Sequence, residues 1–195
     1  MSRTIAAKSD RTKHRILGAA AAAFREHGLE RVGVRDVMKR AGLTRGGFYF
    51  HFADKDALLA EATREAAASN AERHASWAER APEGQKLQAF VESYLSEGHR
   101  DHPDVGCVVA ALGGEIGRAN AKHRKAFTEG IDIVLERIAP YVPGKTPAER
   151  RARAGLLISS MAGVLTVARA LSDRSRSDAL LADARKFYSN YFGEV

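Results

Sequence analysis

Cysteine, proline and tryptophan are scarce in this 195-residue chain, which contains one cysteine, five prolines and one tryptophan. Because Cys107 is the single cysteine, a disulfide within the chain is excluded. No window approaches the roughly 18 consecutive apolar residues that a membrane helix needs. The first ten residues are polar and lack the apolar stretch of a signal peptide, so we expect a cytoplasmic protein without a membrane partner.

Strand-like alternation is also hard to find, whereas alanine, leucine, arginine and glutamate are abundant, which is the composition of helices. Hydrophobic residues make up 45% of the chain, enough for a sizeable core. Apolar residues recur at helical spacing between glycine, proline and capping residues. We therefore predict an all-α fold of nine helices, at residues 12–27, 34–40, 44–50, 54–77, 86–100, 107–116, 120–141, 146–171 and 177–192.

Residues typical of helix ends mark several of these boundaries. Gly28 is a natural end for the first helix, and Thr44 and Asp54 are candidate N-caps. Thr146 is followed by a proline at the first helical position and by Glu149, which together predict a capped start with a capping box.

Positive charge is concentrated near the N-terminus. Residues 1–60 contain 12 Lys and Arg against 6 Asp and Glu, whereas residues 61–195 contain 19 against 18. Such asymmetry suggests a surface for nucleic-acid phosphates, although a generally basic surface would give the same numbers.

The stretch from Val34 to Phe52 is the most informative in the chain. It reads V-R-D-V-M-K-R-A-G-L-T-R-G-G-F-Y-F-H-F, which predicts two short helices joined by a tight corner. The second helix carries hydrogen-bond donors and two glycines rather than a continuous apolar face. A helix-turn-helix with a polar second helix is suited to the DNA major groove.

This stretch resembles the TetR family of one-component transcriptional repressors. The family pattern A-G-[V/L]-[S/T]-x-G-x-[L/F]-Y-x-[H/Y]-F-x-x-K-x-x-L is matched by Ala41, Gly42, Leu43, Thr44, Gly46, Phe48, Tyr49, His51, Phe52, Lys55 and Leu58. Two positions depart from the usual pattern: Gly33 replaces a Thr or Ser cap, and Met38 replaces a small residue. The resemblance covers residues 11–60, and beyond them only the length and helix count agree.

The resemblance implies three parts: a flexible basic arm at 1–10, a helix-turn-helix DNA-binding domain at 11–57, and a ligand-binding and dimerisation domain at 58–195. It also implies a homodimer that binds a palindromic double-stranded DNA operator and is released by a small-molecule effector. We expect no cofactor, no metal and no catalytic residue.

Within the DNA-binding domain, Arg45 is the candidate for reading guanine, because a bidentate arginine is the commonest specific base contact. Thr44 at the helix start would meet a phosphate, where exposed N–H groups favour an anion. The predicted DNA contacts are Arg35, Thr44, Arg45, Gly46, Gly47, Tyr49, His51 and Lys55.

The glycines and aromatic residues of the second helix have competing interpretations. We interpret Gly47 as allowing close approach to DNA and Gly46 as allowing tight packing between helices. The spacing favours core positions for Phe48 and Phe52, and leaves Phe50 between the core and base stacking.

For dimerisation, the final two predicted helices carry small and apolar residues that would form a four-helix bundle with a second copy. The same residues could equally fill the core of one chain. The predicted interface residues are Gly155, Ser159, Ala162, Gly163, Leu180, Ala184, Phe187 and Tyr188.

For the effector, the resemblance implies a cavity among the helices between residues 86 and 171. Apolar and aromatic candidates there fit a largely apolar ligand, and few charges project from these segments, so a highly charged effector is not expected. Each candidate alone could be an ordinary core residue. The predicted lining residues are Phe90, Tyr94, Cys107, Leu112, Phe127, Ile131, Met161 and Leu165.

Cys107 supports further hypotheses, because it lies at a predicted helix start with His99 and His102 nearby in sequence. A thiolate there would sense oxidants or electrophiles, while a buried inert thiol is the plain alternative. The same three residues could be a partial metal site or a cysteine-dependent catalytic pair, but the paired spacing and the usual catalytic motifs are missing. An architectural DNA-binding protein without an effector would not need so large an apolar C-terminal part.

Overall fold

The computed structural model describes residues 2–193 of the chain, and the side chains of residues 9–191. Its α-helices are α1 (Ser2–His27), α2 (Val34–Arg40), α3 (Lys55–Arg80), α4 (Lys86–Tyr94), α5 (Glu97–Asp101), α6 (Val108–Ile116), α7 (Ala121–Ile138), α8 (Pro147–Ala170) and α9 (Arg174–Gly193). Three 3-10 helices, η1 (Arg45–Phe50), η2 (Pro103–Val105) and η3 (Ala139–Tyr141), complete the order. No strand occurs within residues 2–193, which confirms the all-α class and the count of nine α-helices.

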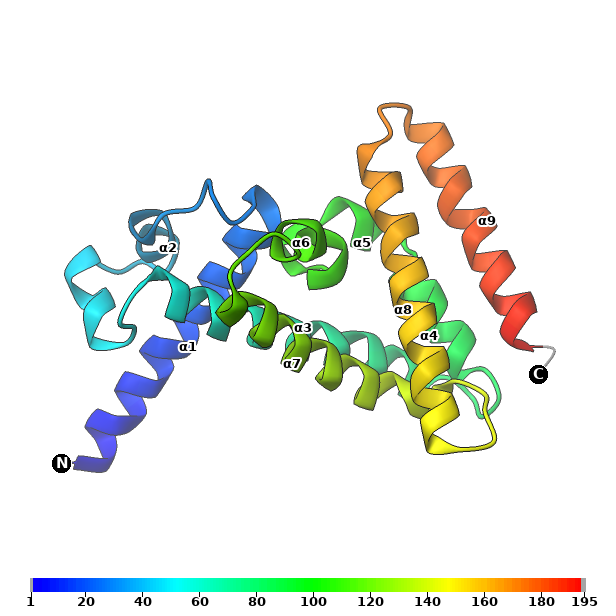
Figure 1. Cartoon of the computed structure of the whole chain (residues 1–195), viewed down its shortest axis with the longest axis horizontal. Coiled ribbons are helices and arrows are strands. Elements are labelled where there is room, and N and C mark those ends of the chain that lie inside the picture. Colours follow the sequence, from blue (N-terminus) through cyan, green and yellow to red (C-terminus); the bar gives the residue numbers. More distant parts are fainter. Residues whose placement is uncertain (1, 194–195) are drawn as a thin grey trace.

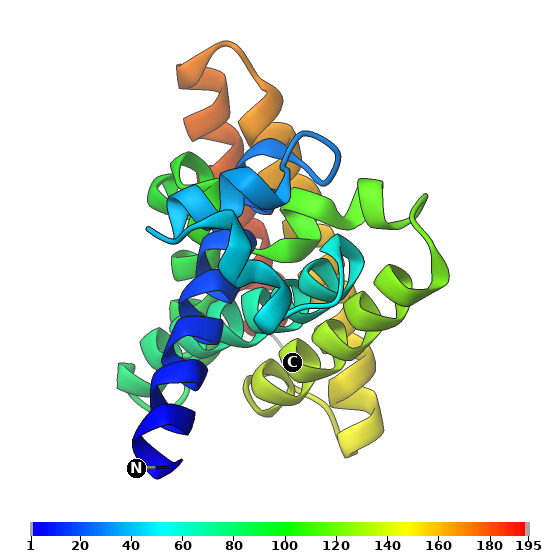
Figure 2. The same cartoon turned by 90° about the vertical axis from the view of Figure 1, so that its left-hand side faces the viewer.

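The helices form a small head and a larger body (Figures 1 and 2). The head consists of α1, α2 and η1, and the helical pair α8–α9 lies at the opposite end of the molecule. The long helix α3 runs from the head into the body, where it packs along α7 and against α4. Since α3 also packs against α1, this one helix contacts both the head and the body.

Side-chain caps fix several helix starts as the sequence predicted. Asp54 accepts a hydrogen bond from the Ala57 amide (2.6 Å), and Thr146 accepts one from the Glu149 amide (3.1 Å). The capping box is shifted by one residue, because the Glu149 carboxylate accepts from the Lys145 amide (2.8 Å) rather than from Thr146. The starts of α3 and α8 are thus set by local hydrogen bonds.

Two predicted boundaries were wrong. Helix α1 begins at Ser2, so the predicted flexible arm is helical over residues 2–10, while Met1 lies outside the described residues. That stretch contains neither proline nor glycine to stop a helix. The single helix predicted at 86–100 is divided into α4 and α5 because Ser96 caps a new start, accepting from the His99 amide (3.1 Å).

Glycine at position 28 allows the head to meet the body. Gly28 ends α1 with φ of 84°, a backbone conformation that favours glycine, and a Cβ there would lie 2.9 Å from a Glu115 carboxylate oxygen. The same carboxylate accepts a hydrogen bond from the Leu29 amide (2.8 Å). The end of α6 is therefore bound directly to the turn that follows α1.

Within residues 2–193, no helix combines the length and apolar character needed to cross a membrane.

Candidate functional site

The corner between α2 and η1 is built from backbone hydrogen bonds around Gly42. This glycine has φ of 64°, and the Leu43 amide donates to the Met38 carbonyl (2.8 Å). The following element is a 3-10 helix, not the α-helix predicted, and the Thr44 side chain does not cap it. Two adjacent glycines disfavour the α-helix, and a bond from the Gly47 amide to the Thr44 carbonyl (3.2 Å) closes the first turn.

Aromatic residues hold η1 against the head. Phe48 is fully buried and Phe52 is 3% exposed, with ring centroids 5.6 Å apart, so their predicted core positions are confirmed. Phe50, which the sequence left open, is 89% exposed, and Tyr49 is 64% exposed. The short helix is thus anchored by one face while the other face is open to solvent.

Most of the predicted DNA contacts are exposed, on η1 or on the preceding residues of the head. Arg35, Thr44, Arg45 and Gly46 are exposed, and His51 is half-buried. A hollow of about 330 Å³ lies between α1, α2 and η1, lined by Ser9, Thr12, Met38, Leu43, Thr44, Gly47, Phe50 and His51. The structure therefore places the start of η1 beside the N-terminal half of α1.

Lys55 and Gly46 differ from their predicted placements. The Lys55 ammonium donates to the Leu29 carbonyl (2.8 Å) and lies 6.0 Å from the centroid of the Phe24 ring, so it is held within the head. A Cβ at Gly46 would meet nothing within 4 Å, so the predicted helix packing at this glycine is wrong. The first turn of α3 faces the loop after α1, which explains the position of Lys55.

The helices α8 and α9 expose a row of large apolar side chains. Leu156, Val167, Phe187 and Tyr191 are 52–73% exposed. A hollow of about 460 Å³ lies between the two helices, lined by Arg153, Leu156, Leu157, Ser160, Phe187, Tyr188 and Tyr191. We call the exposed side chains of Leu156, Val167, Phe187 and Tyr191 the α8–α9 face.

The predicted interface residues divide between this surface and the interior. Ser159, Gly163 and Phe187 are exposed, and Gly155 and Leu180 are half-buried. By contrast, Ala162, Ala184 and Tyr188 are at most 9% exposed and pack within the single chain, so these three belong to its core. Val167 was missed, although its distance of eleven residues from Leu156 places both on one side of α8.

The predicted effector-lining residues are mostly closely packed. Phe90, Tyr94, Cys107, Leu112, Met161 and Leu165 are at most 2% exposed, and Phe127 and Ile131 are half-buried. A hollow of about 510 Å³ opens instead on the side of the body, and none of those eight residues lines it. We call this hollow the α3–α5 groove; it is lined by Arg73, His74, Trp77, Ala89, Glu92, Ser93, Ser96, Gly98, His99, His102 and Val105.

Two buried histidines stand behind the groove. The His99 Nδ1 atom lies 2.6 Å from the Tyr94 carbonyl, and its Nε2 atom accepts from the Cys107 amide (2.8 Å). Burial lowers the pKa of His99 to about 4, and burial followed by the neighbouring His99 lowers the pKa of His74 to about 3. Both rings are therefore neutral at pH 7.

These contacts bear on the hypotheses for Cys107, which is 1% exposed. Because the Nε2 lone pair of His99 is occupied by a backbone amide, this ring is not positioned to take a proton from the thiol. His102 is exposed. Among the described residues, no group of three or more His, Cys, Asp or Glu side chains is arranged to hold a metal ion. The geometry fits a buried core thiol.

Comparison with known proteins identifies the family. Residues 16–62, which include the helix-turn-helix, match the sequence model of the bacterial regulatory proteins of the tetR family. This match assigns the N-terminal part of the chain to the TetR family. It is 35% identical over 86 residues to the A-factor receptor protein of Streptomyces griseus, a match that covers 44% of this chain and 28% of that protein.

Solved structures share the whole TetR-family fold at low sequence identity. A TetR-family transcriptional regulator from Cytophaga hutchinsonii superposes with a TM-score of 0.71 at 21% identity, covering 94% of this chain and 96% of that one. The regulator FadR of Bacillus subtilis in complex with stearoyl-CoA gives 0.67 at 17% identity, covering 89% and 95%. The sequence of the family is thus matched over residues 16–62, while the solved structures share the fold over most of the chain.

In this protein, arginines from three helices hold α5 and the segment that joins it to α6. Arg25 of α1 donates to the carbonyls of Gly106 (3.1 Å) and Asp104, and Arg73 of α3 donates to the carbonyl of Val105. Arg169 of α8 donates to the carbonyls of His99 (2.8 Å) and Arg100 (3.1 Å). Sequence reasoning missed this cluster because its members are far apart along the chain.

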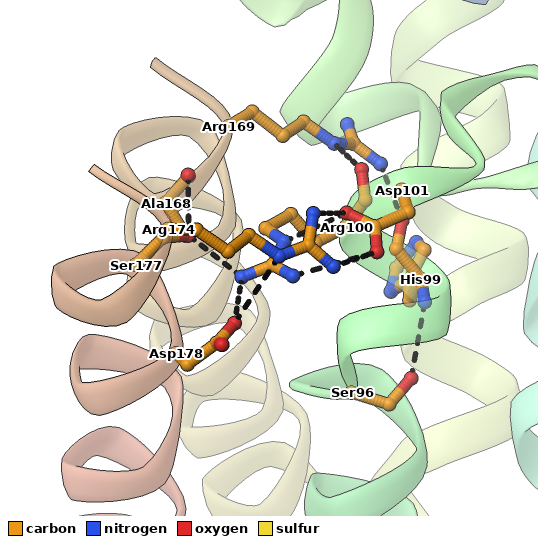
Figure 3. A network of polar contacts seen from close by, with 9 residues as sticks. All are labelled: Ser96, His99, Arg100, Asp101, Ala168, Arg169, Arg174, Ser177 and Asp178. Carbon is orange, nitrogen blue, oxygen red and sulfur yellow. Dashed lines mark hydrogen bonds and ion pairs between the residues drawn. The ribbon is translucent and has the colours of Figure 1, made fainter. Parts of the chain in front are cut away.

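A second polar network joins α5 to the α8–α9 pair (Figure 3). The Arg100 guanidinium is buried and donates to Ser177 (2.8 Å), Asp178 (2.5 Å) and Asp101 (2.8 Å). Arg174 also donates to Asp101, and these two arginines hold the pKa of that carboxyl well below its usual range. Residues 96–107, between the end of α4 and the start of α6, are therefore tied both to the head and to the α8–α9 pair.

Proposed function

We propose that this TetR-family protein is a ligand-responsive transcriptional regulator, acting in the cytoplasm as a repressor that binds a palindromic operator as a homodimer. The observation that carries this proposal is the arrangement of η1, where Phe48 is buried while Arg45 and Tyr49 are exposed. A short helix anchored by one face can enter a major groove with the other. The head, at residues 11–57, is the DNA-binding part in this proposal.

Each exposed group of the head has a role that fits its chemistry. Arg45 reads a guanine, while Thr44, Tyr49, His51 and Arg35 contact phosphates. Gly46 and Gly47 allow the backbone of η1 to approach the base edges closely. Lys55 would first have to release the Leu29 carbonyl, so we assign it no contact in the first encounter with DNA.

The homodimer is proposed to form through the α8–α9 face. Apolar side chains at this exposure are costly in water, and a second copy would cover them in a four-helix bundle. Two heads related by a two-fold axis would then read two half-sites about 34–36 Å apart. This arrangement requires a palindromic operator.

DNA binding is tested with an operator selected from random double-stranded DNA, by fluorescence anisotropy at several salt concentrations. We expect Arg45→Ala to weaken operator binding by about 10- to 100-fold, since a bidentate contact contributes about 1–3 kcal/mol. Arg176→Ala, which removes an exposed arginine of α9, is the matched control. Equal affinity for all duplexes, or equal losses in both variants, would contradict the proposal.

The dimer is tested by sedimentation equilibrium of the full chain. Phe187→Asp places a charge on the α8–α9 face and should shift the protein toward monomer, whereas Asp183→Asn, on the same helix, should not. Because a palindrome needs both heads, Phe187→Asp should also weaken operator binding. A wild-type monomer at micromolar concentration would contradict the dimer.

The body at 58–195 is proposed to bind a small-molecule effector whose binding weakens operator binding by the same factor that DNA weakens effector binding. The name of the Streptomyces griseus receptor and the stearoyl-CoA complex of FadR support a ligand-binding role for the body. Burial of Cys107 does not favour the thiol-sensor alternative. If Cys107→Ser abolished release from DNA by an electrophile, that alternative would replace the effector model.

A further inference from the structure

The α3–α5 groove combines an apolar wall with one strongly basic group. Trp77 is 54% exposed and Val105 is 40% exposed, both unusually open for large apolar side chains. Arg73 lies at the same groove and donates to the Val105 carbonyl. A ligand with a flat or extended apolar part and one acceptor group would match both features.

Positive charge around Arg73 exceeds the negative charge that faces it. Arg25, Arg73 and Arg169 converge on residues 99–106 and donate to backbone carbonyls there. Burial, followed by repulsion from Arg73, lowers the pKa of Arg25 to about 10, and burial also lowers the pKa of Arg73 and Arg169. Glu92 lines the groove as well, but Asp104 is the carboxylate whose charge raises the pKa of both Arg25 and Arg73. These two arginines therefore share one carboxylate, and the remaining positive charge would attract an added anion.

A buried histidine supplies a second, independent observation. His74 lines the groove and is 4% exposed, and its Nδ1 atom lies 2.8 Å from the Ser93 hydroxyl. Its Nε2 atom is buried and has no hydrogen-bond partner among the described residues. Buried polar atoms are rarely left unpaired, so the unpaired Nε2 atom indicates a missing hydrogen-bond partner for this histidine.

We propose that the α3–α5 groove binds a small organic carboxylate, with its carboxylate at Arg73 and His74 and its apolar part against Trp77 and Val105. The proposal rests on the regulator function above and names the class of its effector. Such a ligand carries one negative charge and is otherwise apolar, in keeping with the expected apolar effector. It reaches the body through the side of α3 rather than through the packed residues predicted from the sequence.

The arginine cluster explains how this ligand would reach the DNA-binding head. If a carboxylate replaces the Val105 carbonyl as the acceptor for the Arg73 guanidinium, one of the hydrogen bonds that hold η2 is lost. Two head residues depend on that segment: Arg25 donates to the carbonyls of Asp104 and Gly106, and Arg40 lies 3.9 Å from the Asp104 carboxylate. A shift of η2 would therefore change the position of α1 against the body, and with it the spacing of the two heads in a dimer.

Trp77 makes the binding directly measurable, since it is the single tryptophan of the chain. The full-length protein is titrated with benzoate and octanoate, and with their neutral counterparts benzamide and octanamide, at constant ionic strength. We expect a saturable change in Trp77 fluorescence with at least one acid, and binding at least tenfold weaker for its amide. Saturation by neither acid up to about 10 mM, or equal affinity for acid and amide, would overturn the proposal.

Variants separate the groove from unspecific binding. Arg73→Gln keeps a hydrogen-bond donor but removes the charge, and should weaken acid binding at least tenfold, measured by calorimetry. Arg176→Gln is the control and should leave acid affinity unchanged. Circular dichroism and thermal melting verify that both variants fold; a folded Arg73→Gln variant with wild-type acid affinity would overturn the site.

A labelled operator distinguishes this proposal from the regulator function itself. We expect the bound acid to weaken operator binding, and Arg25→Gln to reduce that coupling while acid binding is retained. Acid binding with unchanged operator affinity would overturn its role as effector. A chain that binds the acid but no duplex in the absence of acid would overturn the regulator function and leave the groove supported.

Discussion

In the head, charged and hydrogen-bonding side chains lie on the surface around a small apolar core, whereas the body turns several of them inward. The exposed face of η1 presents Arg45 and Tyr49 to solvent. The body instead buries Arg100 and two neutral histidines and holds its central segment by arginine–carbonyl contacts. A surface built in this way suits contact with a large partner, while interior polar groups can respond to a small one.

Substitutions at a buried and at an exposed phenylalanine of η1 should differ most in their effect on the free energy of unfolding. Phe48→Ala removes a fully buried ring and should lower the free energy of unfolding by about 3–5 kcal/mol. Phe50→Ala, at a side chain that is 89% exposed, should change it by less than about 0.5 kcal/mol. Urea denaturation followed by circular dichroism checks both. Similar losses in the two variants would show that η1 is not anchored as described.

Acid should destabilise the body through its buried histidines. The pKa values of His99 and His74 fall to about 4 and about 3 in the folded chain, below the ordinary value of 6.5. Each histidine therefore contributes stability above pH 6.5 that is lost as the pH falls, because only the unfolded chain takes up the proton. At about pH 5 the loss should be about 2 kcal/mol for each ring.

This pH dependence is measured as the free energy of unfolding in urea at pH 7 and at pH 5. His74→Asn should lose about half of the effect, and His102→Gln, which removes an exposed histidine, should keep all of it. A wild-type stability that stays constant between these two pH values would mean that the buried rings are accessible to protons.

The network at Arg100 should show the same contrast within the body. Arg100→Ala removes a buried guanidinium from Asp101, Ser177 and Asp178 and should cost about 2–3 kcal/mol of stability. Arg174→Ala removes a mostly exposed partner of Asp101 and should cost less than about 1 kcal/mol. Thermal unfolding of the two variants side by side measures this difference, and a reversed order would refute the buried role of Arg100.

The smallest effects on stability are expected at two glycines of the head, one beside the body and one facing solvent. Gly28→Ala should cost about 1–2 kcal/mol, because φ of 84° is strained for alanine and Glu115 lies close. Gly46→Ala meets open space and should not lower stability, yet it should weaken operator binding if η1 lies against the base edges. An unchanged operator affinity for Gly46→Ala would remove this glycine from the proposed contacts.

The sequence predicted the head better than the body because the head depends on local chemistry. The corner at Gly42 and the cap at Asp54 are set by residues within a few positions, and the recurring phenylalanines mark the buried side of η1. Even there, the 3-10 geometry of η1 and the inward turn of Lys55 required the tertiary structure. Local patterns do not report which distant element a side chain will face.

In the body, the missing information was long-range. Arg25 and Gly106 are 81 positions apart, and Arg100 and Ser177 are 77 apart, so no spacing rule could join them. Six of the eight apolar residues predicted to line a cavity are closely packed, and none of the eight lines the open groove. The residues that line the groove follow no periodic pattern in the sequence. The exposed apolar side chains of α8 could have been predicted from the sequence, since the spacing of Leu156 and Val167 places both on one side of the helix.

The bond between the Glu115 carboxylate and the Leu29 amide limits how freely this protein could be recombined with its relatives. A chimera that joins this head to the body of a relative would retain Gly28 but lose the Glu115 carboxylate that lies beside it. Such an exchange should work only with sensors that carry an equivalent carboxylate at the end of the corresponding helix. Whether the head can be exchanged between relatives therefore depends on one carboxylate in the body that receives it.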